Sequence, residues 1–94
     1  MSRPHRIVSV RLSEIARLEL EYFRKHQPRI AAKISHLITA TAIDPEHGIG
    51  KPERLRHEYA GCWSRRIDAT NRLVYEISGS ELLIIRLRFH YLEN

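Results

Sequence analysis

Residues 62–89, CWSRRIDATNRLVYEISGSELLIIRLRF, decide the fold that the sequence predicts. Apolar and β-branched residues recur here at strand-like spacing, and two short groups of turn residues, 69–71 and 78–80, interrupt them. Strands joined by such short turns run antiparallel. The segment therefore predicts an antiparallel meander with strands at 62–67, 72–77 and 82–89.

Two amphipathic helices are expected upstream of this meander. Ser13 suits the N-cap of the first helix, and Pro28 suits the first turn of the second. Each helix carries one apolar face at helical spacing, and Glu19 interrupts that of the first. The two faces comprise Leu12, Ile15, Ala16, Leu20 and Phe23, and then Ile30, Ile34, Leu37, Ile38 and Thr41.

Two further strands complete the expected fold. Residues 7–10 form a β-prone run, and residues 52–57 suit an edge strand, because Pro52 cannot donate a hydrogen bond to a neighbouring strand. The order predicts an α+β fold, with an N-terminal strand and a helical hairpin packed on a twisted antiparallel sheet. A chain of 94 residues is expected to form one domain over residues 1–94.

Charge and cysteine content narrow the class of protein. The chain has 16 Lys and Arg residues against 11 Asp and Glu, a net charge of +5. This favours RNA, DNA or an acidic protein as partner, although many small domains are basic. The single cysteine, Cys62, cannot form an intramolecular disulfide, and no apolar run approaches the ~18 residues of a membrane span. We expect a cytoplasmic protein without membrane association. Because no His/Cys pattern has zinc spacing, we expect no metal and no other cofactor.

Alternation along the strands predicts that basic residues gather on one face of the sheet. In the last strand Leu83, Ile85, Leu87 and Phe89 point one way, and we expect the helices to cover them. Such a basic face would suit a phosphate or an acidic partner, and it is equally typical of a sheet face that water covers. The residues expected there are Arg72, Arg86, Arg88, His90 and one of the adjacent pair Arg65 and Arg66.

Three side chains of this sequence suit RNA cleavage without a metal. The reaction must deprotonate a ribose 2′-hydroxyl, stabilise charge at phosphorus and protonate the leaving oxygen. Glu53 fits the base, Arg72 the charge stabiliser and His90 the acid. Lys51 and Arg56 flank Glu53 and could bind neighbouring phosphates. In the simpler interpretation Glu53 is a solvated carboxylate, and His90 stands out only through its place at a strand end.

Four motifs in order resemble the YoeB-type toxins of the RelE/ParE superfamily. They are GIGKPERL at 48–55, GCWSRRI at 61–67, RLVY at 72–75 and HY at 90–91. The resemblance implies a toxin of a bacterial type II toxin–antitoxin system that enters the ribosomal A site and cuts mRNA. It further implies a YefM-like antitoxin as partner, binding of operator DNA only through the toxin–antitoxin complex, and dimers, which are frequent in the family.

The same resemblance assigns roles to individual residues. It places the general base at Glu53, the phosphate-stabilising arginine at Arg72 and the general acid at His90, and it counts the terminal tyrosine, Tyr91, among the catalytic residues. Substrate contacts fall on Lys51, Arg56, Arg65 and Arg66, to which strand alternation adds Arg86 and Arg88. The chain departs from the family at Arg56, where lysine is usual, at Cys62, where a larger apolar residue is usual, and in the added tail 92–94.

Two other functions are compatible with the same fold. ParE-like toxins share it and inhibit DNA gyrase without cleaving RNA, and a basic RNA- or protein-binding module could retain it with a degenerate site. The presence of Glu53, Arg72 and His90 together favours the ribonuclease, because an inhibitor that only binds needs no acid–base pair.

Overall fold

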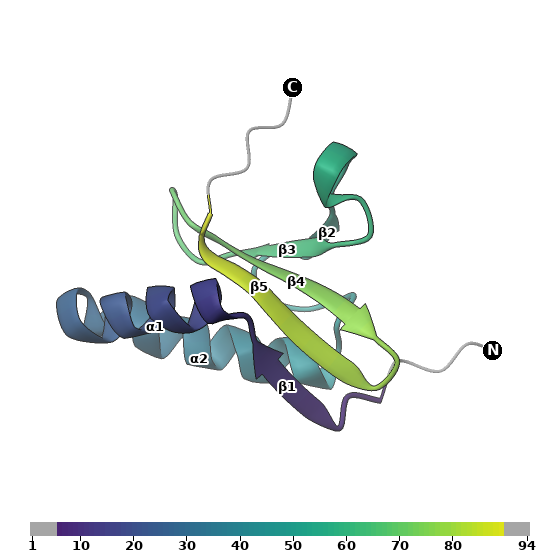
Figure 1. The fold of residues 1–94 in the computed structure, drawn as a ribbon, viewed down its shortest axis with the longest axis horizontal. Coiled ribbons are helices and arrows are strands. Elements are labelled where there is room, and N and C mark those ends of the chain that lie inside the picture. Colours follow the sequence, from purple (N-terminus) through teal and green to yellow (C-terminus); the bar gives the residue numbers. More distant parts are fainter. Residues whose placement is uncertain (1–5, 90–94) are drawn as a thin grey trace.

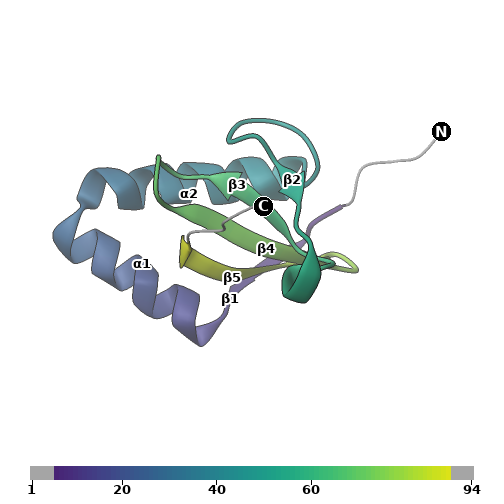
Figure 2. The same ribbon diagram turned by 90° about the horizontal axis from the view of Figure 1, so that it is seen from above.

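The computed structural model, which describes residues 6–89, contains two helices on one face of a five-stranded sheet (Figures 1 and 2). The strand order is β1-β5-β4-β3-β2. The elements are β1 (Ser9–Leu12), α1 (Glu14–His26), α2 (Pro28–Ile43), β2 (Glu53–Arg54), a 3₁₀ turn (His57–Tyr59), β3 (Trp63–Arg66), β4 (Arg72–Ser78) and β5 (Glu81–Phe89). The α+β fold is confirmed. Strand β1 runs parallel to β5, so the sheet is mixed and only the remaining pairs are antiparallel.

The start of each helix follows the sequence prediction. The Ser13 hydroxyl accepts the backbone N–H of Ala16 at 3.0 Å and donates to the carbonyl of Ile85 at 2.7 Å, so the cap also fastens α1 to the sheet. Pro28 stands in the first turn of α2. The prediction that Ile15 lies on the buried face of α1 is wrong, because 54% of its surface is exposed. Its position lies about 100° from that of Ala16, enough to carry it beyond the sheet.

Strand boundaries differ from the prediction at both edges of the sheet. The first strand is Ser9–Leu12 rather than residues 7–10. The expected strand at 52–57 is reduced to Glu53–Arg54 and followed by the 3₁₀ turn. His57 has a φ of 60°, outside the range of extended backbone, so the edge strand ends before it.

The face assignment predicted for the last strand is wrong for most of its residues. Its register with β4 shifts twice, between the partners of Arg72 and Val74 and again between those of Val74 and Tyr75. Each shift inserts a residue into β5 and breaks the alternation of its side chains. The residues that face the helices are therefore Leu82, Ile84 and Leu87, whereas Ile85 and Phe89 join a second cluster with Leu55, Cys62 and Val74.

Two arginines of β5 that were predicted on an open surface contact α1. The Arg86 guanidinium donates to Glu19 from Nη2 at 3.0 Å and from Nε at 3.3 Å, and the backbone N–H of Leu87 donates to the same carboxylate at 2.8 Å. Arg88 lies over the ring of Tyr22, 4.0 Å from its centroid. The prediction that Arg88 shares an open face with Arg72 is therefore wrong, whereas Arg86, the cross-strand partner of Val74, also lies over the ring of Phe89 and is held at the edge by Glu19. Glu19, which seemed to interrupt an apolar face, is the anchor of this contact.

These contacts make Glu19 a pH-dependent contributor to stability. Burial alone would raise its pKa, but hydrogen bonds from Arg86 and from the backbone of Leu87 and Arg88 outweigh burial and lower the pKa below its ordinary value. A carboxylate with a lowered pKa stabilises the fold fully above its unfolded pKa of about 4.3, and this contribution is lost as pH falls through the folded pKa.

We predict that Glu19→Gln lowers the free energy of unfolding at pH 7 by about 1.5–3 kcal/mol, as expected for hydrogen bonds to a charged group. The variant should also lose part of the stability change that the wild type shows below about pH 4.3. Urea unfolding at pH 7 and at pH 3.5 measures both effects. Glu21→Gln is the matched control, because Glu21 pairs with Arg17 on the exposed side of the same helix. Equal effects of the two substitutions would contradict the assignment.

Candidate active site

The centre of the candidate site is a contact between Glu53 and Arg72. Nη1 of Arg72 donates to Oε1 of Glu53 and, at 3.2 Å, to the hydroxyl of Ser64. Ser64 is fully buried and is the cross-strand partner of Glu53, so Arg72 reaches across β3 to the edge strand β2. The side chain of Arg72 is 19% exposed and that of Glu53 44% exposed. The arginine is thus fixed by its surroundings, while the carboxylate stays open to a ligand.

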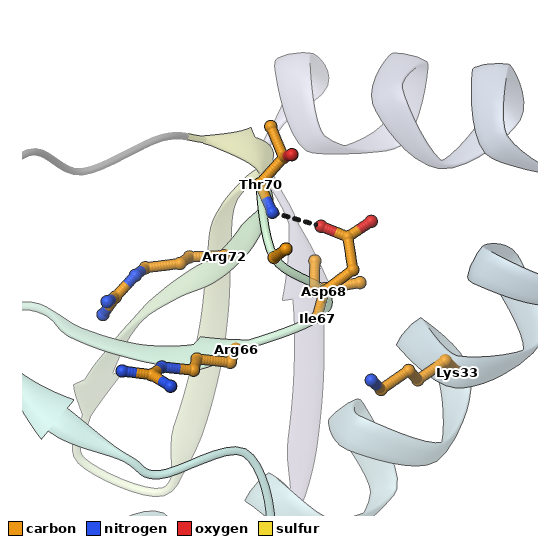
Figure 3. Close-up of a pocket in the computed structure, with 7 residues that line it drawn as sticks. Lys33, Arg66, Ile67, Asp68, Thr70 and Arg72 are labelled. Carbon is orange, nitrogen blue, oxygen red and sulfur yellow. Dashed lines mark hydrogen bonds between the residues drawn. The ribbon is translucent and has the colours of Figure 1, made fainter.

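Further cations surround this contact. Arg66 is the cross-strand partner of Arg72 and is exposed. Figure 3 shows both side chains extending in the same direction from neighbouring strands. They line an open pocket of about 630 Å³, which Lys33 of α2 also lines. Lys51, just before β2, is exposed and lines a neighbouring pocket with Lys33 and Arg66. The site therefore offers several positive charges around one carboxylate, which suits a phosphodiester.

Arg65 does not take part in this surface. It is fully buried, and its guanidinium donates to the carbonyl oxygens of Asp44, of His47 at 2.9 Å and of Ile49 at 3.0 Å. Its Nε lies 3.4 Å from the hydroxyl of Tyr75. These bonds hold the loop between α2 and β2 from inside. The expected substrate contact of Arg65 is therefore replaced by a structural role, and of the adjacent pair only Arg66 is exposed.

The loop that Arg65 holds leads directly into the site. The carbonyl of Gly50 accepts the N–H of Arg66 at 2.7 Å. Gly50 has a φ of +82°, and a Cβ there would lie 3.0 Å from Leu37 and 3.1 Å from the Cβ of Arg65. Only glycine combines this backbone with this close approach. The loop thus fixes where Lys51 and Glu53 begin.

The remaining predicted residues are placed as follows. Arg56 is exposed two residues beyond the end of β2. Arg86 and Arg88 contact α1, as described above. His90 and Tyr91 lie outside the described residues. The last described residue, Phe89, is the cross-strand partner of Arg72.

Sequence reasoning missed two residues of the site. Ser64 was visible in the motif GCWSRRI, but its contact with Arg72 depends on the register of three strands. Lys33 stands on the polar side of α2, and only the packing of that helix brings it beside Arg66. Within residues 6–89 no three His, Cys, Asp or Glu side chains are grouped to hold a metal ion. Neither α1 nor α2 has the length and apolar character of a membrane-crossing helix.

Comparison with known proteins identifies the family. Residues 13–91 match the model of the YoeB-like toxins of bacterial type II toxin–antitoxin systems. This chain belongs to that family. Toxin YoeB of Synechocystis is 42% identical over 84 residues, which cover 89% of this chain and 98% of the relative.

Solved structures of YoeB proteins share the fold. A YoeB/ParE toxin from Agrobacterium tumefaciens superposes with a TM-score of 0.86 at 38% identity, covering 89% of this chain and all of that one. YoeB of Staphylococcus aureus has been solved as a dimer, with a TM-score of 0.83, 31% identity and coverage of 92% and 99%. It has also been solved in a YoeB–YefM complex, with a TM-score of 0.80, 30% identity and coverage of 96% and 100%.

We predict that the adjacent arginines 65 and 66 respond very differently to the same substitution. Arg65→Lys cannot reach all the loop carbonyls with one ammonium group, so each buried acceptor left unpaired costs about 1–3 kcal/mol of unfolding free energy. Arg66→Lys should change that free energy by no more than about 0.5 kcal/mol, because the residue is exposed. Chemical unfolding of both variants measures the difference. Comparable stability of the two would contradict the structural role of Arg65.

Proposed function

We propose that this YoeB-family toxin is a ribosome-dependent endoribonuclease that cuts mRNA by acid–base catalysis and thereby inhibits translation. The contact between Glu53 and Arg72 is the observation that carries the proposal. The carboxylate of Glu53 is accessible to solvent. It contacts the largely buried guanidinium of Arg72, which also donates a hydrogen bond to Ser64. A base and a phosphate ligand are thus already side by side, as cleavage at a ribose–phosphate junction requires.

In the proposed reaction Glu53 takes the proton of the 2′-hydroxyl, and the resulting oxygen attacks the adjacent phosphorus. Arg72 stabilises the negative charge that develops on the phosphate oxygens; its five N–H groups can serve a carboxylate and a phosphate together. His90, which lies outside the described residues, gives a proton to the departing 5′-oxygen. The bond from phosphorus to that oxygen breaks, leaving a 2′,3′-cyclic phosphate and a 5′-hydroxyl. No group beyond these side chains is required for the proton transfers.

Other residues take supporting roles in this proposal. Lys51, Arg56 and Arg66 bind phosphates that flank the cut, since all three are exposed around β2 and β3. Tyr91, outside the described residues, is assigned to the catalytic group with His90. Arg65 supports the loop, and Arg86 and Arg88 support the packing of α1 against β5, so none of these three is assigned a substrate contact.

We propose partners from the same family relationship. S. aureus YoeB forms a complex with YefM, and a YefM-like antitoxin is the expected partner of this chain. Binding to operator DNA would require that complex. The dimer of S. aureus YoeB supports self-association of this chain as well. The proposed target is a ribosome that carries mRNA in its A site. The proposed location of the toxin is therefore the cytoplasm.

We predict that Glu53→Gln, Arg72→Ala and His90→Ala each slow mRNA cleavage on ribosomes by about 10²–10⁴-fold, the usual effect of removing a general acid, a general base or a charge stabiliser. Each should also relieve growth arrest when the chain is induced in bacteria. Glu81→Gln is the control, because Glu81 pairs with Arg11 at the far edge of the sheet. Unfolding midpoints identify any variant that fails to fold. Wild-type cleavage by all three folded variants would refute the assignment.

The ends of the RNA products provide a separate test. Attack by a 2′-hydroxyl leaves a cyclic phosphate on the upstream fragment and a 5′-hydroxyl on the downstream one. We predict that the downstream fragment is a substrate for polynucleotide kinase without prior phosphatase treatment. A 5′-phosphate would show that water is the nucleophile and that the proposed role of Glu53 is wrong.

A further inference from the structure

Lys33 and Arg66 form a ridge between two neighbouring pockets. The first, here called the basic pocket, is lined by Lys33, Arg66, Asp68, Thr70 and Arg72 among others. The second, here called the apolar pocket, is lined by Lys33, Arg66, His36, Leu37 and Ile49 among others. Lys33 comes from α2 and Arg66 from β3, so the ridge joins the helical layer to the sheet. Figure 3 shows Lys33 pointing from its helix toward the strand that carries Arg66.

The basic pocket has the charges of a phosphate site. Lys33, Arg66 and Arg72 line it together with one carboxylate, that of Asp68. Asp68 already accepts the backbone N–H groups of Thr70 at 2.8 Å and of Asn71 at 2.6 Å, and the Asn71 side-chain amide at 3.3 Å. These bonds hold it in the turn between β3 and β4. Three cationic residues therefore line the pocket together with one carboxylate that the turn engages.

The apolar pocket has the features of a nucleobase site. It measures about 290 Å³, and Leu37 and Ile49 contribute aliphatic surface to it. Ile49 is 46% exposed, which places apolar surface within reach of a ligand. His36 contributes an aromatic ring and Arg66 a planar guanidinium, the two kinds of surface on which proteins stack unpaired bases.

We propose that the Lys33–Arg66 ridge binds one nucleotide next to the cleaved bond, with its phosphate in the basic pocket and its base in the apolar pocket. This inference rests on the proposed ribonuclease function and extends it to a positioning residue on α2. The proposed ligand is single-stranded RNA rather than an acidic peptide. A pocket lined by cations beside a pocket lined by aliphatic and stacking groups suits the phosphate and the base of one nucleotide. Arg72 lines the basic pocket, so the bound nucleotide continues into the candidate active site.

The test measures binding of the full chain to a short single-stranded RNA that carries a 2′-O-methyl group at each position and cannot be cut. Fluorescence anisotropy at several NaCl concentrations gives the slope of log affinity against log salt. Removing one phosphate contact reduces that slope by about 0.7 for a single strand. We expect this reduction for Lys33→Gln, recovery in Lys33→Arg and no change in Lys25→Gln, a control in the last turn of α1. His36→Ala should weaken binding to the intact RNA and have little effect on an RNA in which the bases are absent.

Cleavage on ribosomes, measured in parallel, separates this inference from the function on which it rests. Lys33→Gln should raise the KM for mRNA-programmed ribosomes and leave kcat close to wild type, because Lys33 does not contact the reacting atoms. If the wild type cuts mRNA and Lys33→Gln has the same salt slope as Lys25→Gln, the proposed nucleotide binding at the ridge is wrong, while the ribonuclease function stands. If Lys33→Gln weakens only binding of the antitoxin, the ridge serves a protein partner and the inference is overturned. If the wild type binds the RNA with the expected slopes but never cuts mRNA, the ribonuclease function fails, and so does the place of the ridge beside a cleaved bond.

Discussion

The buried guanidinium of Arg65 is the constraint on which the geometry of the site depends. Removing a charge from water is costly unless hydrogen bonds replace its hydration. Here three carbonyls of a single loop supply those bonds, so the loop can adopt only conformations that turn its oxygens inward. The same loop continues through Gly50 to Lys51 and Glu53. A residue that faces the core thus decides where the candidate base stands.

The site is organised before any ligand arrives. Arg72 already contacts Glu53 and Ser64, so little side-chain freedom remains to be lost when a phosphate binds. A phosphate that enters the site can use the N–H groups of Arg72 that Glu53 and Ser64 do not engage.

The sequence predicted the features that depend on local rules. The cap at Ser13, the proline at the start of α2 and the order of elements follow from neighbouring residues alone. The motif around Glu53 and Arg72 predicted a pair that the structure does bring together. What local rules could not supply was the register of β5. Strict alternation assumes a regular ladder, and the residue inserted between Ile84 and Arg86 reverses the faces of Ile84 and Ile85 relative to Leu87. The choice between Arg65 and Arg66 also needed the loop packed against them.

The place of β5 in the sheet has a consequence for how the protein folds during its synthesis. It lies between β1 and β4, so the first strand pairs with residues 81–84 and the N-terminal helix hydrogen-bonds to residues 85–87. The hydrogen-bonded partners lie 72 and 68 residues apart in the sequence, so a ribosome makes the N-terminal elements long before the strand that they contact. The N-terminal two-thirds of a nascent chain can form helices, but it has no central strand on which to assemble them. A protein proposed to attack ribosomes is thereby unable to complete its own fold until the ribosome that makes it has passed residues 81–87.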